Sequence, residues 1–274
     1  MAKSERSDPI TPFLKWPGGK RWFIANHSHL LPRTFKQYIE PFLGGASVFF
    51  FLRPKKALLG DTNHDLIHTY QTIKVNWVAL EDRLRQHDSN HGVRYYYRTR
   101  DSAPRKDINR AAWLVYLNRT CFNGIYRVNL QGNFNVPKGT KDTVLYNTDD
   151  FRVIAQALSD ADLRVSDFEL LVDEARKGDL VFADPPYTVR HNLNGFIKYN
   201  ETLFSWDDQV RLADALARAR NRGAKIVSTN ANHASVRELY RERKFTLRTV
   251  SRFSPISADP EGRTQFEELV ILTN

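Results

Sequence analysis

The chain has 274 residues, of which 41% are hydrophobic, and a formal net charge of +10. This length and composition suit one large domain, or one domain that carries an insertion. The positive charge favours a polyanionic partner. The single cysteine, Cys121, excludes a disulfide framework and a cysteine-based zinc site, so we expect a protein of the reducing cytoplasm.

Two further classes of protein are disfavoured. The sequence has no apolar run of about 18 residues and no signal-peptide pattern, which argues against a membrane-spanning or secreted chain. The eight histidines are scattered, with no pair at metal-ligand spacing, so we predict that no metal is bound.

A glycine pair lies near the N-terminus, in Trp16-Pro17-Gly18-Gly19-Lys20. It is either a loop that lets the backbone approach a ligand closely or a plain N-terminal turn, and a helix is expected from about 21 to 31. Residues 37–40 are predicted to form a strand that ends at Glu40, and Gly44-Gly45-Ala46 lies in the turn before a helix at 48–52.

A second strand, 57–60, ends at Asp61, where a carboxylate is placed to bind the hydroxyls of a ribose. This order of elements favours an adenosine-containing cofactor, but the glycine spacing is not G-x-G-x-x-G, so the dinucleotide fingerprint fails. Residues 63–87 are predicted to form a long helix. Its apolar stripe is interpreted as core: Leu66, Ile67, Tyr70, Ile73, Trp77, Leu80 and Leu84.

From about residue 90 to residue 146, arginines and lysines are interleaved with aromatic residues. Such a mixture is typical of a nucleic-acid-reading segment. Asn-Gly at 123–124 and Gly-Asn at 132–133 predict tight turns and a hairpin. The weaker alternative is a surface helical hairpin with a solvated basic face.

Helices and strands alternate again after this segment. Asp167 and Phe168 follow a predicted strand, where they could frame an adenine ring; equally, Asp167 could cap the next helix. The other expected elements are a helix at 149–158, a lid-like loop at 188–203, a capping box at Ser205 and Asp208, a buried strand at 225–230, and two strands at 245–250 and 268–272 around a loop at 254–263.

The chemistry is expected at Asp184-Pro185-Pro186-Tyr187, directly after a short buried strand at 180–183. Two prolines end the strand abruptly and hold a carboxylate, a carbonyl and an aromatic ring in fixed relative positions. The carboxylate of Asp184 and the carbonyl of Pro185 could accept hydrogen bonds from an exocyclic amine of a nucleobase and stabilise the positive charge that develops on it. Tyr187 could stack on a flipped base. The plainer alternative is a tight turn after a strand.

Together these segments resemble the Dam-type DNA adenine-N6 methyltransferases. The matching pieces follow the family's order and cover nearly the whole chain: 13–20, Glu40 to Ser47, Asp61-x-Asn63-x-Asp65-Leu66, Asn118 to Gly139, and Asp184 to Tyr187. The resemblance implies an α/β, Rossmann-like methyltransferase fold with a mixed sheet and helices on both faces. A catalytic domain at 1–90 and 147–274 would carry an inserted, mainly helical target-recognition domain with a hairpin at 91–146.

The resemblance also implies S-adenosylmethionine as the methyl donor and N6 of a flipped adenine in double-stranded DNA as the acceptor. The catalytic residues would be Asp184, Pro185, Pro186 and Tyr187. The matching cofactor residues are Trp16, Lys20, Glu40, Phe42, Gly44, Gly45, Asp61, Asp167, Phe168 and Asp184. We expect a cytoplasmic monomer that associates with the nucleoid through DNA.

In the family's DNA-reading element, Phe122 matches an aromatic wedge, Ile125 an aliphatic contact to a thymine methyl, and Arg127 an arginine bidentate to guanine. Lys15 matches a lysine near the outer guanine, and the implied target is GATC or a close relative. The remaining expected DNA contacts are Arg119, Asn123, Asn135, Pro137 and Lys138.

Three positions depart from the family pattern. Phe122 stands where Tyr is frequent and keeps a stacking face, and Ala46 stands where Gly is usual. Thr140 stands where the enterobacterial enzymes have arginine, and the loss of this basic contact is expected to change sequence stringency or flanking preference. Cytosine C5 methylation is disfavoured because Cys121 lies outside any Pro-Cys pair. DNA cytosine-N4 methylation, RNA methylation and a non-catalytic DNA-binding relative stay as alternatives.

Overall fold

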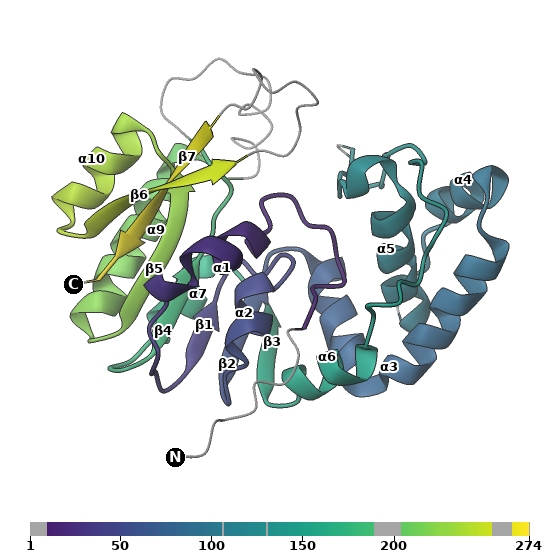
Figure 1. The fold of residues 1–274 in the computed structure, drawn as a ribbon, viewed down its shortest axis with the longest axis horizontal. Helices are drawn as coiled ribbons and strands as arrows, with labels where there is room; N and C mark the ends of the chain where they lie inside the picture. The colour runs from purple at the N-terminus through teal and green to yellow at the C-terminus, as the bar shows by residue number, and fades with distance from the viewer. Residues whose placement is uncertain (1–9, 106, 130, 189–203, 254–264, 274) are drawn as a thin grey trace. The chain divides into compact units, whose positions relative to one another are not determined.

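The computed structural model describes residues 10–105, 107–129, 131–188, 204–253 and 265–273. The chain forms two compact units (Figure 1). The first unit comprises Met1–Arg21, Leu43–Lys55 and Asn63–Val165, and the second comprises Trp22–Phe42, Lys56–Thr62 and Ser166–Asn274. The lid predicted at 188–203, beyond Thr188, and the loop predicted at 254–263 lie outside the described residues.

The predicted domain boundaries differ from this division. The segment 91–146 lies in the first unit, together with helices that precede and follow it in the sequence. A separate target-recognition domain at 91–146 therefore stays a prediction.

The second unit is built on a mixed sheet. Its strands are β1 (Tyr38–Glu40), β2 (Ala57–Asp61), β4 (Leu180–Ala183), β5 (Lys225–Ala231), β6 (Thr246–Phe253) and β7 (Gln265–Leu272). They follow the order β2-β1-β4-β5-β7-β6. The first four in this order are parallel, whereas β7 is antiparallel to both β5 and β6. The carboxyl ends of β2, β1, β4 and β5 therefore lie along one edge.

Helices cover both faces of this sheet, as predicted. The helices of the unit are α1 (Arg21–His27), α7 (Phe168–Asp173), α9 (Trp206–Asn221) and α10 (Ala234–Glu242), with the short 3-10 helix η1 (Ser28–Leu30). Figure 1 shows α9 and α10 in green beside β5 and β6. Successive side chains of a strand point to opposite faces. Val181 and Ala183 thus join the core under α7, α9 and α10, while the ring of Phe182 lies 6.0 Å from that of Phe23 in α1.

The first unit is mainly helical. It contains α2 (Ser47–Leu52), α3 (His64–Asn90), α4 (Val93–Asp101), α5 (Ile108–Thr120), η2 (Phe122–Gly124), α6 (Phe151–Leu158) and the strand β3 (Ala161–Val165). Every residue of α5 from Ala111 to Thr120 is buried. The predicted stripe of α3 is also buried, except that Trp77 is half-buried. Asn63 caps α3 by accepting from the Leu66 N–H at 3.0 Å, and the helix is interrupted at Asn76.

Most predicted elements are present with shifted ends. Strand β4 spans 180–183 as expected, and the Ser205–Asp208 capping box begins α9. The helix expected from 21 to 31 ends at His27 and continues as η1. The predicted hairpin is reduced to two isolated bridges, Cys121 with Lys138 and Val128 with Phe134. Among the described residues, no helix is both long and apolar enough to cross a membrane.

The C-terminal end of α3 is joined to α4 and α5 by His87. Its ring stacks on Tyr116 of α5, with centroids 4.6 Å apart, and its Nδ1 is 2.9 Å from the hydroxyl of Tyr95. Burial, aided by the nearby Arg83 guanidinium, lowers the pKa of His87 to about 4. The imidazole is therefore neutral in the folded protein at physiological pH.

Folding should become less favourable between pH 6.5 and pH 4 because of His87. The unfolded chain takes up a proton near pH 6.5, whereas the folded chain resists protonation until about pH 4. The stabilisation is thus complete above pH 6.5 and is lost as the pH falls toward 4. Urea unfolding at several pH values should show a steeper loss in the wild type than in His87→Phe, which keeps a ring on Tyr116. Parallel pH curves for the two proteins would contradict the assignment.

Candidate active site and DNA-facing surface

The predicted catalytic tetrad follows β4 at the edge where the parallel strands end. The register pairs Ala183 of β4 with Ser228 of β5, so Asp184 comes to lie beside Thr229. The Thr229 hydroxyl donates to Oδ1 of Asp184 at 2.6 Å. Pro185 is buried, and the carbonyl of Pro186 accepts from Nε2 of Gln209 in α9 at 3.4 Å.

The ring of Tyr187 is half-buried, and its hydroxyl donates to Oε2 of Glu268 in β7 at 2.5 Å. Burial raises the pKa of the Tyr187 phenol well above its ordinary value, and the carboxylates of Asp184 and Glu268 raise it further. Tyr187 is therefore a neutral hydrogen-bond donor with a fixed ring position.

Acidic side chains gather at the same sheet edge. Glu40 ends β1, Asp61 ends β2, and Asp184 follows β4, so three neighbouring parallel strands each end in a carboxylate. Glu40 is buried and accepts from the Tyr38 hydroxyl at 2.9 Å, and burial beside this carboxylate raises the pKa of Tyr38 well above its ordinary value. Carboxylates in this position suit a ligand that carries positive charge and hydroxyl donors.

Asp167 and Phe168 occupy defined places next to this edge. Asp167 caps α7 by accepting from the Glu169 N–H at 2.9 Å, and its other oxygen pairs with Arg211 at 2.7 Å. The guanidinium of Arg211 lies over the Phe168 ring, 4.6 Å from its centroid, and Phe42 stacks on the same ring at 5.4 Å. The capping role that the sequence left open for Asp167 is thus present, and its contact with an adenine ring stays a prediction.

In the first unit, Trp16 joins three segments that are distant in sequence. Its indole packs against Gly44, where a Cβ atom would lie 2.7 Å from Cδ1 of Trp16, and its Cβ lies against Gly45. It also stacks on Tyr126, with centroids 5.4 Å apart. Gly44 has φ +45° and its carbonyl accepts from the Tyr70 hydroxyl at 2.9 Å. The glycine pair of this turn therefore makes room for an aromatic ring, and a side chain at Gly44 would displace it.

The loop that contains Lys15, Trp16 and Lys20 is fastened by polar contacts. Asn118 accepts from the Lys15 N–H at 2.9 Å, and its Nδ2 donates to the carbonyls of Lys15 and Gly124 at 2.7 and 3.2 Å. Lys20 is buried, and its ammonium donates to the Gly18 carbonyl at 2.9 Å. Asn118 thus holds Lys15 next to the segment that starts at Phe122.

Most of the predicted DNA contacts are displayed on the surface of this unit. Phe122 is 52% exposed and Ile125 is 40% exposed, although both are large apolar residues. The Arg127 side chain is exposed, and its Nε donates to Oδ1 of Asn135 at 2.9 Å, which fixes the plane of the guanidinium. The other exposed or half-buried members of the predicted set are Lys15, Asn123, Pro137 and Lys138.

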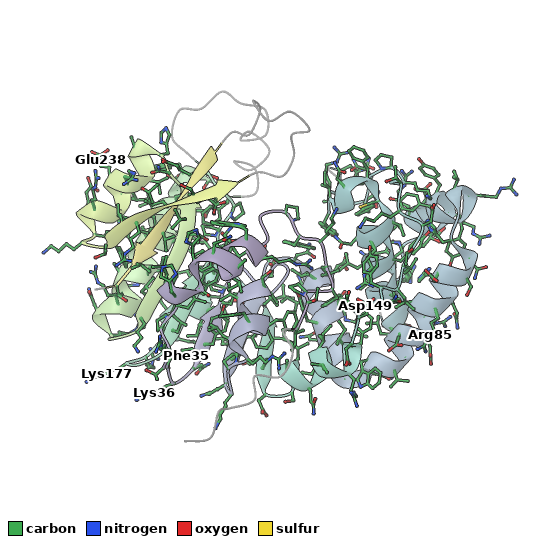
Figure 2. The ribbon with its side chains drawn as sticks, in the orientation of Figure 1. Phe35, Lys36, Arg85, Asp149, Lys177 and Glu238 are labelled. Atoms are coloured by element: carbon green, nitrogen blue, oxygen red, sulfur yellow. The ribbon has the colours of Figure 1, made fainter. Side chains whose placement is uncertain are left out.

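Arg119 requires a correction, because its side chain is buried instead of facing outward. It pairs with Asp149, labelled in Figure 2, at 2.5 and 2.8 Å, and donates to the carbonyls of Phe13 and Val144. A guanidinium has five N–H donors, and these contacts use all of them. Arg119 therefore ties three segments of the first unit together, and contact with DNA would require breaking these bonds.

Several residues of the site could not be found by local pattern. Four residues reach the predicted site from distant parts of the sequence: Thr229, Glu268, Gln209 and Arg211. The sequence predicts Tyr38 only as part of a strand, and its hydroxyl contacts Glu40. One signal was present in the sequence: Glu268 is acidic but precedes the apolar run 269–272. In the described parts of the chain, His, Cys, Asp and Glu form no group of three or more that could hold a metal ion.

Comparison with known proteins decides the family. The model of the "D12 class N6 adenine-specific DNA methyltransferase" family matches residues 16–254. The chain belongs to this family. It is therefore an adenine-specific DNA methyltransferase, and the family implies a methyl donor and a DNA substrate.

Curated relatives match over nearly the full length. The chain is 32% identical to the type II methyltransferase M1.LlaDCHI of Lactococcus lactis subsp. cremoris, over 96% of this chain and 95% of the relative. It is 32% identical to the type II methyltransferase M.MjaIII of Methanocaldococcus jannaschii, over 81% and 84% of the two chains. It is also 31% identical to the DNA adenine methylase of Haemophilus influenzae, over 95% and 93%. The Rossmann-like methyltransferase fold expected from the sequence agrees with this family.

Arg119→Ala should lower the free energy of unfolding by about 3–5 kcal/mol, because it leaves the half-buried carboxylate of Asp149 without its ionic partner and the carbonyls of Phe13 and Val144 without their donor. Urea unfolding checks this, with Arg127→Ala as the control: Arg127 is exposed, and its loss should change stability by about 0.5 kcal/mol or less. If Arg119→Ala is as stable as the wild type but binds DNA less tightly, Arg119 contacts DNA as the sequence predicts.

Proposed function

We propose that this enzyme transfers a methyl group from S-adenosylmethionine to N6 of an adenine turned out of duplex DNA, within GATC or a closely related sequence. The observation that carries the proposal is the arrangement after β4. There Asp184 is fixed by Thr229 and Tyr187 by Glu268, at the sheet edge where α/β proteins bind ligands.

The acidic edge supports S-adenosylmethionine as the donor. When bound, this cofactor supplies a methyl group on a positively charged sulfur. Asp61 at the end of β2 is placed for the ribose hydroxyls, and Glu40 and Asp184 supply negative charge for the cationic groups. In the first unit, Trp16, Lys20, Gly44 and Gly45 are the further proposed cofactor residues.

Catalysis in this proposal is positioning and electrostatics. The Asp184 carboxylate and the Pro185 carbonyl accept hydrogen bonds from the adenine amino group and stabilise the positive charge that forms on N6 as the N–CH3 bond forms and the methyl–sulfur bond of the donor breaks. The methylated amine then releases one proton to solvent and is neutral again. Pro185 and Pro186 keep these two oxygens in place because their φ angles are fixed. Tyr187 stacks on the flipped base, which offsets part of the cost of about a few kcal/mol for extruding it.

The exposed segment of the first unit supports sequence-specific DNA reading. Arg127 has the planar fork that pairs with guanine O6 and N7, and Asn135 fixes its orientation. Ile125 offers an apolar surface to a thymine methyl group, and Phe122 offers a ring that can enter a duplex. We assign target recognition to the segment 91–146 on this basis.

Cys121 gives no support to cytosine C5 chemistry. Its thiol is buried, burial raises its pKa to about 11, and Sγ lies 3.5 Å from the Ile125 carbonyl. The reactive form of a cysteine nucleophile is the thiolate. This cysteine therefore stays protonated at physiological pH.

Asp184→Ala should lower kcat by at least about 10²–10³-fold, because the charge that develops on N6 loses its main partner. DNA affinity should change little, since phosphate contacts supply most of it. Unmethylated plasmid is incubated with S-adenosylmethionine, digested to nucleosides and assayed for N6-methyladenine. Methylcytosine without N6-methyladenine in the wild-type reaction, or undiminished turnover by the variant, would contradict the proposal.

Arg127→Ala should relax specificity at a single guanine of the target, at a cost of about 1–3 kcal/mol. Methylation rates on duplexes with one substituted base pair at each position measure this. Lys141→Ala serves as the control, because Lys141 is exposed in the same unit but lies outside the proposed reading residues. An equal loss of binding on all sequences would make Arg127 a phosphate contact.

A further inference from the structure

The tetrad Asp184 to Tyr187 is hydrogen-bonded to side chains of β5, β7 and α9. Asp184 and Pro186 each accept a hydrogen bond from a residue that is distant in sequence, and Tyr187 donates a hydrogen bond to such a residue. These residues are Thr229, Gln209 and Glu268, and all three are buried. None of them belongs to the tetrad or to the predicted cofactor and DNA contacts.

Thr229 meets Asp184 because β4 and β5 pair in parallel. Ala183 lies opposite Ser228, and one residue further along both strands the hydroxyl of Thr229 reaches Oδ1 of Asp184 at 2.6 Å. The Thr229 side chain is 0% exposed, so its rotamer is fixed by packing. A short hydrogen bond from a fixed donor sets the plane of the carboxylate and hence the direction in which its other oxygen faces.

Glu268 meets Tyr187 because β7 runs antiparallel to β5. The register pairs Glu268 with Ala231, which brings an early residue of β7 to the edge where β5 ends. Oε2 of Glu268 accepts from the Tyr187 hydroxyl at 2.5 Å. A ring whose far end is hydrogen-bonded is limited in its tilt, and a stacking surface for a base depends on that tilt.

A second set of contacts holds the tetrad from the other face of the sheet. Asn230 of β5 donates to Oε1 of Gln209 at 3.0 Å, and Nε2 of Gln209 points to the Pro186 carbonyl at 3.4 Å. Both amide side chains are 0% exposed. The peptide that follows the Pro185 carbonyl is therefore supported by α9, while Asp184 and Tyr187 are supported by β5 and β7.

The identity of these residues points to function instead of to stability. Glu268 is 6% exposed and is followed by Leu269, Val270 and Ile271, which are fully buried. Burial of a carboxylate is costly, and an apolar residue of similar size is often neutral or stabilising in such a place. The carboxylates of Asp184 and Glu268 both raise the pKa of the Tyr187 phenol. A protein selected for stability alone gains little from this arrangement.

We propose that Thr229 and Glu268 are positioning residues of the methyl-transfer reaction: Thr229 orients the Asp184 carboxylate and Glu268 orients the Tyr187 ring. This inference rests on the proposed roles of Asp184 and Tyr187. Neither residue touches the reacting atoms. Both act through a tetrad residue, so their loss lowers the rate of the chemical step more than it weakens binding of DNA.

The test for Thr229 compares an isosteric with a conservative substitution. Thr229→Val keeps the shape and removes the hydroxyl, and it should lower kcat about tenfold to a hundredfold with little change in the KM for DNA. Thr229→Ser keeps the hydroxyl and should recover most of the rate. Ser228→Ala is the matched control, because Ser228 is equally buried in β5 but points to the opposite face.

The test for Glu268 adds a spectroscopic readout. Glu268→Leu should lower kcat about tenfold or more and weaken the fluorescence increase of 2-aminopurine placed at the methylated adenine, which reports a flipped base. Glu268→Gln retains an acceptor oxygen and should recover much of both signals. Glu267→Gln is the control: Glu267 is exposed, points to the other face of β7 and accepts from Asn232 at 2.6 Å. The thermal unfolding temperature is measured for every variant.

The outcomes separate this inference from the proposed function. Undiminished turnover by Asp184→Ala overturns the proposed role of the tetrad and this inference with it. If Asp184→Ala is inactive while Thr229→Val and Glu268→Leu match the wild type, only the positioning roles are wrong. A loss of rate that parallels a loss of unfolding temperature would show that both residues have a structural role. The same conclusion would follow if Thr229→Ser and Glu268→Gln did not recover the rate. If Thr229→Val does not fold, Thr229→Ala replaces it, and failure of both to fold overturns the proposal for Thr229.

Discussion

The parallel pairing of β4 with β5 is the constraint on which the proposed catalytic tetrad depends. It sets Asp184 beside Thr229, and it places the end of β5 where the antiparallel β7 can bring Glu268 to Tyr187. Two prolines prevent the chain from continuing the ladder, so the tetrad leaves the sheet at a fixed point. A shift of one residue in this pairing would turn Thr229 to the other face and leave Asp184 without its hydroxyl partner.

In the first unit, the comparable constraint is the close packing of Trp16. Its indole requires the missing side chain of Gly44, stacks on Tyr126, and follows Lys15, which Asn118 holds in place. Residues proposed to contact the cofactor and residues proposed to read DNA therefore share one set of contacts within this unit. The exposed Phe122 and Ile125 project from a segment that is anchored on its buried side.

Buried polar groups serve two different purposes in the two units. Arg119 uses all of its donors within the fold and joins segments around Phe13, Val144 and Asp149, so it contributes to stability. Thr229 donates to Asp184 and Glu268 accepts from Tyr187 in the proposed catalytic tetrad, at a cost in burial that packing alone does not explain. A buried polar atom must have a partner, and this rule identifies Arg119 as a structural residue and supports the proposed positioning roles of Thr229 and Glu268.

The elements whose cause is local, and the family that their order implies, follow from the amino-acid sequence alone. The apolar run 180–183 and its two prolines define β4 and its end, Ser205 and Asp208 begin α9, and the stripe of α3 predicts its buried face. The tetrad and the residues proposed to read DNA were predicted from residue types and spacing, and the structure shows where they lie while their roles stay predictions. Long-range packing, in contrast, determines that Arg119 is buried, that Asp167 caps α7 while it pairs with Arg211, and that Tyr187 is hydrogen-bonded to Glu268. Each of these contacts joins residues that are 30 or more positions apart in the sequence. Such contacts depend on strand order and register, which neither periodicity nor propensity specifies over that range.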